Sequence, residues 1–365
     1  MEKILKLKEL LRSRGIDSII IGPSDDLEYL IGFKSSPDDR FQGYFINSDP
    51  EKKDFYVVPK INHEEVAKHV GQVEYIIWGD EEGFLDKTIE KLKSQYDYKP
   101  IIAVNFTIRA NDTIDMLEQM DIKFINGHRL MEDFRISKTK EEIENMKIAG
   151  QIADKTMDDI FNFIKAGMYE SEIKDEIVRL LIENGGDDIS FEPIVASGPN
   201  SSMPHYNEGT RKIKEKDVII LDFGCKYKGM CSDTSRTIFV GDISPEEMEI
   251  YNIVKEAFEK GQAVSAEDVT ADFIDTETRN IIDDKGYGQY FLNRTGHGIG
   301  FSVHEAPYIK KNNERIIADG MAFSIEPGIY IPGKFGMRIE NIVAFKNGEK
   351  IIMNNSSTEI RIVKV

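Results

Sequence analysis

Cysteine is scarce in this sequence of 365 residues, which contains Cys225 and Cys231 and no others. The two are six positions apart and form neither a CxxC pair nor a Cys/His zinc pattern. So few cysteines exclude a disulfide scaffold. One strand and its turn could hold both, so a disulfide stays an alternative, but we interpret them as free buried thiols. Free thiols are typical of a reducing compartment, and they predict a cytoplasmic protein.

Long apolar runs and an excess of positive charge are also missing. No segment approaches the roughly 18 apolar residues that a membrane span needs. Residues 1–15 interrupt their apolar positions with lysine and glutamate, which predicts an amphipathic helix and not a signal peptide. The net charge is −18, from 47 basic and 65 acidic side chains. This balance predicts no nucleic-acid partner and no binding to anionic membranes.

The pattern of elements predicts two domains, 1–132 and 133–365. The first alternates helical and strand segments, which indicates a smaller α/β domain whose sheet is covered by helices. A polar stretch follows, and Thr139 with Glu142 fits a capping box at the start of a long helix. The second domain has two helices, several strands, two further helices and more strands. This order predicts an α+β domain with a curved, mostly antiparallel sheet covered by helices.

Chemistry-bearing residues concentrate in the second domain. The first domain shows no phosphate loop, metal-ligand spacing or nucleophile elbow. Four carboxylates and one histidine of the second domain lie in or beside apolar or glycine-rich stretches, where an unpaired charge is costly. They are Asp222 in VIILDFG, Asp233 in MCSDTSRTI, His297 in TGHGIG, Glu326 in FSIEPGIY and Glu340 in GMRIENIV.

Several carboxylates in one pocket cannot all stay ionised without cations. Two divalent ions would resolve this, since carboxylates can bridge a pair of metals. Oxygen-rich ligation with one imidazole favours Mn, Co or Zn over a thiolate-type site. His205 in SGPNSSMPHY and His304 in SVHEAP lie in loops rich in glycine or proline. We interpret both as groups that could donate hydrogen bonds to a reacting carbonyl.

Four stretches of the second domain resemble the motifs of the pita-bread metallopeptidases of family M24. These stretches are FEPIVASGPNSSMPHY, VIILDFGCKYKGMCSDTSRTI, RTGHGIGFSVHEAP and FSIEPGIYIPGKFGMRIENIV. Within that family they are most similar to the proline-specific branch, which comprises aminopeptidase P and prolidase. The resemblance extends over about residues 135–365, and the first domain resembles the smaller creatinase-like domain in size and pattern only.

The resemblance implies a role for each matched residue. Asp222 would chelate one metal, Asp233 and Glu340 would bridge both, and His297 and Glu326 would bind the second. A hydroxide between the metals would attack the scissile carbonyl. Glu326 would also shuttle a proton.

The resemblance also implies roles outside the metal ligands. His205 and His304 would steady the carbonyl and the tetrahedral intermediate. Arg338 is two residues before Glu340 and on the same strand face. It would hold the Glu340 carboxylate in position without itself binding a metal.

The sequence departs from the family pattern in two places. Many dipeptidase-type members carry arginine shortly after the second histidine to grip the substrate carboxylate, but here Tyr308 follows HEAP. We expect Tyr308 to contact substrate, with Lys310 or Lys311 as alternatives for the missing charge. Many members also have aspartate after the bridging glutamate, where this chain has Asn341. Side chains alternate along a strand, so Asn341 should face away from the metals.

The resemblance therefore implies a metal-dependent exopeptidase that cleaves between an N-terminal residue and proline. Whether its substrate is a dipeptide or a longer peptide stays open, and a homodimer is expected. The alternatives are a metal-free creatinase-type hydrolase, a peptidase-like binding protein without catalysis, and a methionine aminopeptidase. The intact ligand set argues against the first two. The large first domain and the HEAP context argue against the third.

Overall fold

The computed structural model describes residues 2–364 and divides after Arg135 into two compact units. Unit 1 contains one mixed sheet of strand order β4-β3-β2-β1-β5-β6. Its strands are β1 (Ser18–Ile21), β2 (Gly43–Asn47), β3 (Phe55–Pro59), β4 (Glu74–Trp78), β5 (Ile101–Val104) and β6 (Lys123–Asn126). Its helices are α1 (Glu2–Ser13), α2 (Asp25–Ile31), α3 (His63–Val70), α4 (Leu85–Gln95), α5 (Ala110–Gln119) and α6 (His128–Arg135).

The sheet of unit 1 is buried on both faces. In β1, Ile19 and Ile21 join one hydrophobic cluster, whereas Ile20 joins the cluster on the opposite face. This alternation explains why the strand reads as a continuous apolar run. The prediction of a helix-covered α/β sheet is therefore confirmed.

Unit 2 is built from two larger, mostly antiparallel sheets and smaller β pairings, and among the described residues the one parallel pair of the larger sheets joins β12 and β20. The first large sheet has the order β20-β12-β9-β8, and the second has the order β14-β13-β15-β18-β19. Their strands are β8 (Ile194–Ser197), β9 (Val218–Phe223), β12 (Thr234–Val240), β13 (Gly296–Gly298), β14 (Glu305–Ile309), β15 (Ala322–Ile325), β18 (Asn341–Lys346), β19 (Glu349–Ile352) and β20 (Ile362–Val363). The remaining strands are β7 (Asp188–Ile189), β10 (Cys225–Tyr227), β11 (Met230–Cys231), β16 (Gly328–Ile331) and β17 (Phe335–Arg338).

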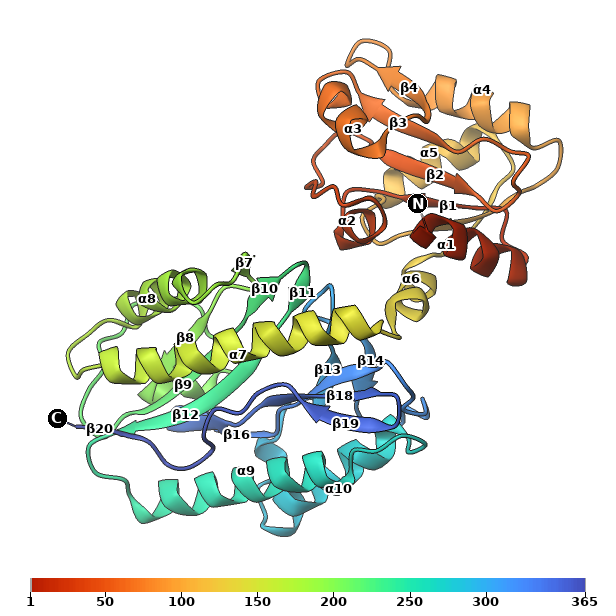
Figure 1. Ribbon diagram of the computed structural model, residues 1–365. Coiled ribbons are helices and arrows are strands. Elements are labelled where there is room, and N and C mark those ends of the chain that lie inside the picture. The colour runs from red at the N-terminus through yellow and green to blue at the C-terminus, as the bar shows by residue number, and fades with distance from the viewer. Residues whose placement is uncertain (1, 365) are drawn as a thin grey trace. The chain divides into compact units, whose positions relative to one another are not determined.

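Two helix pairs cover the strands of unit 2, and Figure 1 shows the pairs on opposite sides of them. The helices are α7 (Lys140–Phe163), α8 (Glu170–Glu183), α9 (Pro245–Val264) and α10 (Ala271–Asp284), with short 3₁₀ turns η1 (Gly198–Ser202) and η2 (Gly288–Tyr290). Helices α7 and α8 pack on β9 and β12, whereas α9 and α10 pack on β15 and β18. The predicted capping box of α7 is confirmed, because the Thr139 hydroxyl accepts from the Glu142 backbone amide and the Glu142 carboxylate accepts from Thr139 N.

Two strand predictions were wrong, because the stretches MAFSIEPGIY and MRIENIVAF each divide between two sheets. MAFSIEPGIY forms β15, which pairs with β18, and β16, which pairs with β17. The stretch MRIENIVAF is not one strand, because β17 ends at Arg338 and pairs with β16, whereas β18 begins at Asn341 and pairs with β15. At the break, the Glu340 backbone amide donates to the Ser235 carbonyl, 3.1 Å away. The chain therefore crosses from one sheet to another at Glu340, and this crossing brings its carboxylate beside β12.

Two further sequence expectations can be compared with the structure. Cys225 and Cys231 are both free and buried, as predicted. Among residues 2–364, no helix combines the length and the apolar character needed to cross a membrane.

Candidate metal centre

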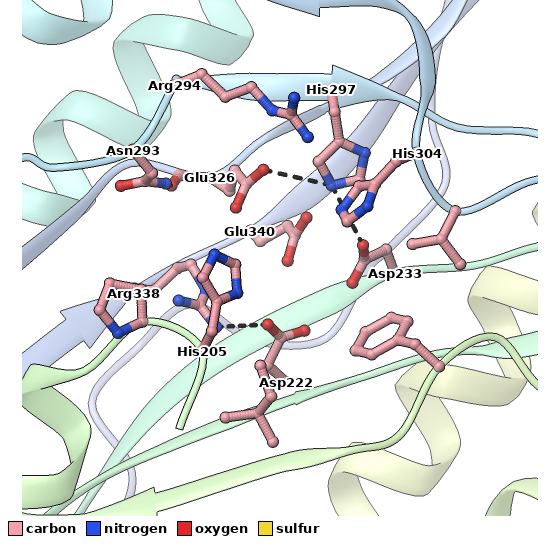
Figure 2. Close-up of a pocket in the computed structure, with 14 residues that line it drawn as sticks. His205, Asp222, Asp233, Asn293, Arg294, His297, His304, Glu326, Arg338 and Glu340 are labelled. Carbon is pink, nitrogen blue, oxygen red and sulfur yellow. Dashed lines mark hydrogen bonds and ion pairs between the residues drawn. The ribbon is translucent and has the colours of Figure 1, made fainter. Parts of the chain in front are cut away.

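Unit 2 contains a cavity of about 540 Å³ whose wall carries acidic, histidine and arginine side chains. Figure 2 shows acidic and histidine side chains from separate segments directed toward one another in this space. The residues that line the cavity are Phe191, Ile194, Pro204, His205, Asp222, Asp233, Asn293, Arg294, His297, Val303, His304, Glu326, Arg338 and Glu340.

Strand alternation in β9 and β12 places two of the carboxylates. Leu221 and Phe223 of β9 join the core beneath α7 and α8, so Asp222 between them projects from the other face. The antiparallel register sets Ser235 of β12 opposite Asp222. Asp233 directly precedes β12 and is two residues from Ser235, so both side chains project toward the cavity.

His297 is held between two neighbouring strands by the glycines on either side of it. A Cβ at Gly296 would collide with the Ser324 carbonyl, and one at Gly298 would collide with the Ala306 backbone. Glycine at both positions therefore lets β13 fit tightly between β14 and β15. Within this packing, the His297 backbone amide donates to the Ser324 hydroxyl at 3.0 Å.

The imidazole orientation of His297 suits a metal ligand. Its Nδ1 lies 3.1 Å from the Gly298 carbonyl oxygen, a contact that favours a proton on Nδ1 and leaves Nε2 as an acceptor. Nε2 is 3.4 Å from a Glu326 oxygen and 3.6 Å from an Asp233 oxygen. Burial lowers the pKa of His297, and the neighbouring His304 lowers it further. The neutral imidazole that results is the form that binds a cation.

Arg338 supports the acidic cluster from behind, although not in the way that the sequence predicted. Its guanidinium forms an ion pair with Asp222 and donates to the Ser235 hydroxyl at 2.8 Å and to the Tyr330 hydroxyl at 2.7 Å. Ser235 in turn donates to a Glu340 oxygen at 2.7 Å. Arg338 therefore contacts Asp222 directly and reaches Glu340 through a hydroxyl, because the chain leaves β17 before Glu340.

Three carboxylate oxygens in this cluster fit a bound cation. The buried atoms Asp222 Oδ1, Asp233 Oδ1 and Glu340 Oε1 have no hydrogen-bond partner among the residues that the structure describes. Ligand atoms of Asp233, His297 and Glu340 all lie within 4.8 Å of one another. Burial raises the pKa of Asp233, and the charges of Glu340 and Asp222 raise it further. A divalent cation would supply the missing partner and relieve this repulsion.

Glu326 makes cation binding sensitive to pH. Burial raises its pKa to about 7. A proton on this carboxylate competes with a cation, so we expect Mn²⁺ affinity to fall as the pH is lowered from 8 to 6, by about tenfold per pH unit for each proton released. Calorimetric Mn²⁺ titration of chelator-treated protein, in buffers of different ionisation enthalpy, measures both the affinity and the protons. Glu326→Gln should make this dependence less steep, by the share of this one proton, because the raised pKa values of Asp233 and Glu340 keep part of it. A pH-independent affinity in the unsubstituted protein would contradict the expectation.

The structure brings all but one of the sequence-predicted site residues to the cavity. His205 and His304 line it at exposed positions, and the His304 ring centroid is 4.3 Å from that of His297. Among the residues that the structure describes, the lining of the cavity does not include Tyr308, Lys310 or Lys311. Asn341 is also outside the lining and accepts a hydrogen bond from Arg236 at 2.8 Å.

Sequence reasoning missed two polar residues of the wall, Asn293 and Arg294. Asn293 donates from its amide to the Glu326 backbone carbonyl at 3.4 Å. The guanidinium of Arg294 lies 4.8 Å from the ring centroid of Tyr308. Their position four and three residues before His297 was a signal that could have found them, because the segment that leads into β13 brings its side chains to the same site.

Comparison with known proteins supplies family matches along the chain. A model described as metallopeptidase family M24 matches residues 144–347, and one described as the Creatinase/Prolidase N-terminal domain matches residues 3–137. A curated Xaa-Pro dipeptidase of Lactobacillus delbrueckii subsp. lactis is 31% identical over 370 residues, which cover 99% of this chain and 98% of the relative.

Solved structures show the same likeness. A recombinant prolidase from Thermococcus sibiricus superposes with a TM-score of 0.93 at 34% identity, covering 99% of this chain and 98% of that one. An X-Pro aminopeptidase from Thermotoga maritima superposes with a TM-score of 0.83 at 29% identity, covering 99% of both chains. Both dipeptidase and aminopeptidase names therefore occur among proteins of this architecture.

Proposed function

Since the chain belongs to metallopeptidase family M24, we propose that it hydrolyses the bond between an N-terminal residue and proline with the help of two divalent cations. The main observation behind this proposal is that three carboxylate oxygens in the wall of one cavity have no hydrogen-bond partner among the described residues. Full-length relatives named Xaa-Pro dipeptidase and prolidase support the substrate class.

The residues of the cluster divide into ligands and supports. We assign Asp222 to one cation, His297 and Glu326 to the other, and Asp233 and Glu340 to both. Oxygen-rich ligation with one imidazole favours Mn or Co, with Zn as a further candidate. Bound cations of this kind would activate water and polarise a carbonyl.

Three protein groups serve the reacting peptide in this proposal. His205 and His304, which both line the cavity, would donate hydrogen bonds to the scissile carbonyl oxygen. Burial lowers the pKa of His304, and the charge of Arg294 lowers it further, so the ring is neutral near pH 7 and donates one N–H. Glu326, with its pKa raised to about 7 by burial, can hold or release a proton at neutral pH.

The cavity also suits the tertiary amide bond that precedes a proline residue. A proline nitrogen carries no N–H in the peptide bond, so its pocket needs no acceptor for one. Phe191, Ile194, Pro204 and Val303 supply an apolar part of the wall that can cover the pyrrolidine ring and exclude water.

Hydrolysis of proline peptides tests this function. The Mn²⁺-loaded protein should cleave Ala-Pro or Ala-Pro-Ala at the bond before proline, and it should leave Ala-Ala largely intact. Chelator treatment should remove this activity and added Mn²⁺ should restore it, with metal content measured in each state. Failure to cleave either proline peptide at full metal content would instead favour a peptide-binding protein without catalysis.

Three further expectations belong to the same proposal. We place the domain boundary at residue 132/133, close to the division after Arg135 between the two units. The free thiols of Cys225 and Cys231 support a cytoplasmic location. The resemblance to proline-specific peptidases supports a homodimer, and exposed apolar side chains such as Ile61 and Phe106 on unit 1 are available for such a contact.

A further inference from the structure

Two guanidinium groups line the cavity, and their surroundings differ. Arg338 is buried and committed to Asp222, Ser235 and Tyr330. Arg294 is half-buried, and among residues 2–364 its guanidinium forms no ion pair and no hydrogen bond, although its charge partly offsets the rise that burial causes in the pKa of Glu326. Figure 2 shows it above the acidic cluster, on the segment that leads to His297. The guanidinium of Arg294 in the cavity wall is thus available to bind a ligand.

The chemistry of a guanidinium indicates which chemical group such a ligand would carry. Its planar fork of N–H donors matches the two oxygens of a carboxylate. Among the described residues, no carboxylate of the cavity forms an ion pair with Arg294, because Asp222 is paired with Arg338, Asp233 and Glu340 belong to the candidate metal centre, and Glu326 lies 3.4 Å from His297 Nε2. A carboxylate held directly by Arg294 would therefore come from a ligand.

Tyr308 holds this fork in place. The Arg294 guanidinium carbon lies 4.8 Å from the centroid of the Tyr308 ring, within the range of a cation–π contact. Tyr308 belongs to β14 and lies outside the cavity lining, so its ring supports Arg294 from the side away from the ligand space. A contact of this kind orients the guanidinium without neutralising its charge.

The backbone on both sides of Arg294 is also fixed. Arg279 donates to the carbonyl of Asn293 at 3.1 Å and is paired with the fully buried Asp275 at 2.8 Å. Asp275 accepts from the backbone amide and the hydroxyl of Thr295, at 3.2 and 2.7 Å. The residues before and after Arg294 are therefore tied to one buried ion pair, which reduces the entropy that ligand binding must overcome.

A dipeptide carries its carboxylate close to the bond that would be cleaved. From the scissile carbonyl carbon, the chain runs through the proline nitrogen and Cα to the carboxyl carbon. Three bonds of about 1.3–1.5 Å each put that carboxylate within about 4 Å of the reacting carbon. It must therefore enter the same cavity as the metal ligands. A longer peptide has an uncharged amide at this point and continues past it.

We propose that Arg294 is a specificity-determining residue that binds the C-terminal carboxylate of an Xaa-Pro dipeptide, with Tyr308 as its positioning residue. The inference rests on the proposed Xaa-Pro peptidase function and narrows it to a dipeptidase. It also assigns the positive charge that binds this carboxylate to Arg294, three residues before His297 in RTGHGIG, and not to a residue after the second histidine, His304.

Kinetics with matched substrates test the inference. Ala-Pro and its C-terminal amide differ at the carboxylate alone, and Ala-Pro-Ala adds a residue. The Mn²⁺-loaded protein should have a kcat/KM for Ala-Pro about 100-fold above that for the amide. Arg294→Gln should lower kcat/KM for Ala-Pro about 100-fold, mainly through KM, and should remove most of the preference for Ala-Pro over its amide. Inhibition by free proline, which retains the carboxylate, should weaken in parallel.

Three variants separate this role from a general structural one. Tyr308→Phe keeps the ring and should stay within about threefold of the unsubstituted protein, whereas Tyr308→Leu should raise KM for Ala-Pro about tenfold. Arg361 is the matched control, because its guanidinium also lies over a ring, 5.3 Å from the Phe161 centroid, but outside the cavity lining. Arg361→Gln should leave the preference for Ala-Pro over its amide unchanged, and metal content should be equal in all variants.

Each contrary outcome has a distinct meaning. Equal hydrolysis of Ala-Pro and its amide by the unsubstituted protein would overturn the inference and leave an Xaa-Pro aminopeptidase. Equal losses for both substrates in Arg294→Gln would also overturn it, because the arginine would then serve the fold or the metal centre. No hydrolysis of any of the three substrates at full metal content would overturn the inference together with the proposed function.

Discussion

The Asp233→Asn variant should lose peptidase activity by about 10³-fold or more while it keeps its fold. Asp233 is buried, one of its oxygens is 3.6 Å from His297 Nε2, and the other has no hydrogen-bond partner among the described residues. Asparagine preserves the shape of the side chain and removes its charge. In the proposed function Asp233 is a metal ligand, and loss of such a ligand would remove several kcal/mol of transition-state stabilisation, which corresponds to this factor.

The same substitution should have the opposite effect on stability without metal. Burial raises the pKa of Asp233, followed by the charges of Glu340 and Asp222, so ionising this group in the folded protein is unfavourable. A raised carboxyl pKa means that stability is lost as the pH rises through that pKa. At neutral pH, chelator-treated Asp233→Asn should therefore unfold at or above the Tm of the unsubstituted protein.

Metal content, kcat/KM and thermal unfolding together test this pair of effects. Asp242→Asn is the matched control, since Asp233 directly precedes β12 and the exposed Asp242 lies two residues beyond its end. The control should retain activity, bound metal and Tm. Full metal content and undiminished activity in Asp233→Asn would refute the bridging assignment, and a collapsed fold would show that Asp233 is needed for packing.

A second large effect is expected at Lys138, whose ammonium group lies 2.5 Å from a Glu305 oxygen with both side chains 2% exposed. Lys138→Met should destabilise the protein by about 3–5 kcal/mol, because it leaves a carboxylate buried without its partner. Glu305 directly follows His304 and accepts from the Ser302 backbone amide at 3.4 Å. We therefore expect the loop that carries His304 to lose its fixed position as well.

Denaturant unfolding of matched variants measures this effect. Lys334 and Glu246 form a pair of similar length, 2.9 Å, in which the side chains are 56% and 48% exposed. Lys334→Met should change the free energy of unfolding by less than about 1 kcal/mol. The double variant Lys138→Met/Glu305→Leu should regain much of the loss, since it removes the buried charge. Equal effects of Lys138→Met and Lys334→Met would contradict the importance of burial.

Much of the fold could be predicted from the sequence, and the exceptions have local causes. The two-domain organisation and the pita-bread architecture are confirmed by the family matches and by solved prolidase structures. Helix α5 was not predicted, and the structure buries one of its apolar side chains, Met116, while Ile114 and Leu117 stay exposed. The division of MRIENIVAF between two sheets was also missed, because alternation along a strand does not reveal which strand lies beside it.

The candidate site shows the same limit. Asp222, Asp233, His297, Glu326 and Glu340 could be identified because each is a charged or imidazole group in a local context that disfavours burial without a partner. Arg294 has no such context, since an arginine before a strand is ordinary at a protein surface. The direct partner of Arg338 was misassigned to Glu340, two residues away, whereas the structure pairs it with Asp222, 116 positions earlier.

The sequence by itself determined the metal-binding character of this protein and its family, because these follow from residue types in short motifs. Through its resemblance to proline-specific peptidases, the sequence also led to the expectation that the substrate contains proline. The tertiary structure alone decided that Arg338 supports Asp222, that Glu340 lies at a crossing between sheets, and that Arg294 faces the cavity over Tyr308. Such contacts depend on how separate sheets pack together, and residue order along one strand carries no information about that packing.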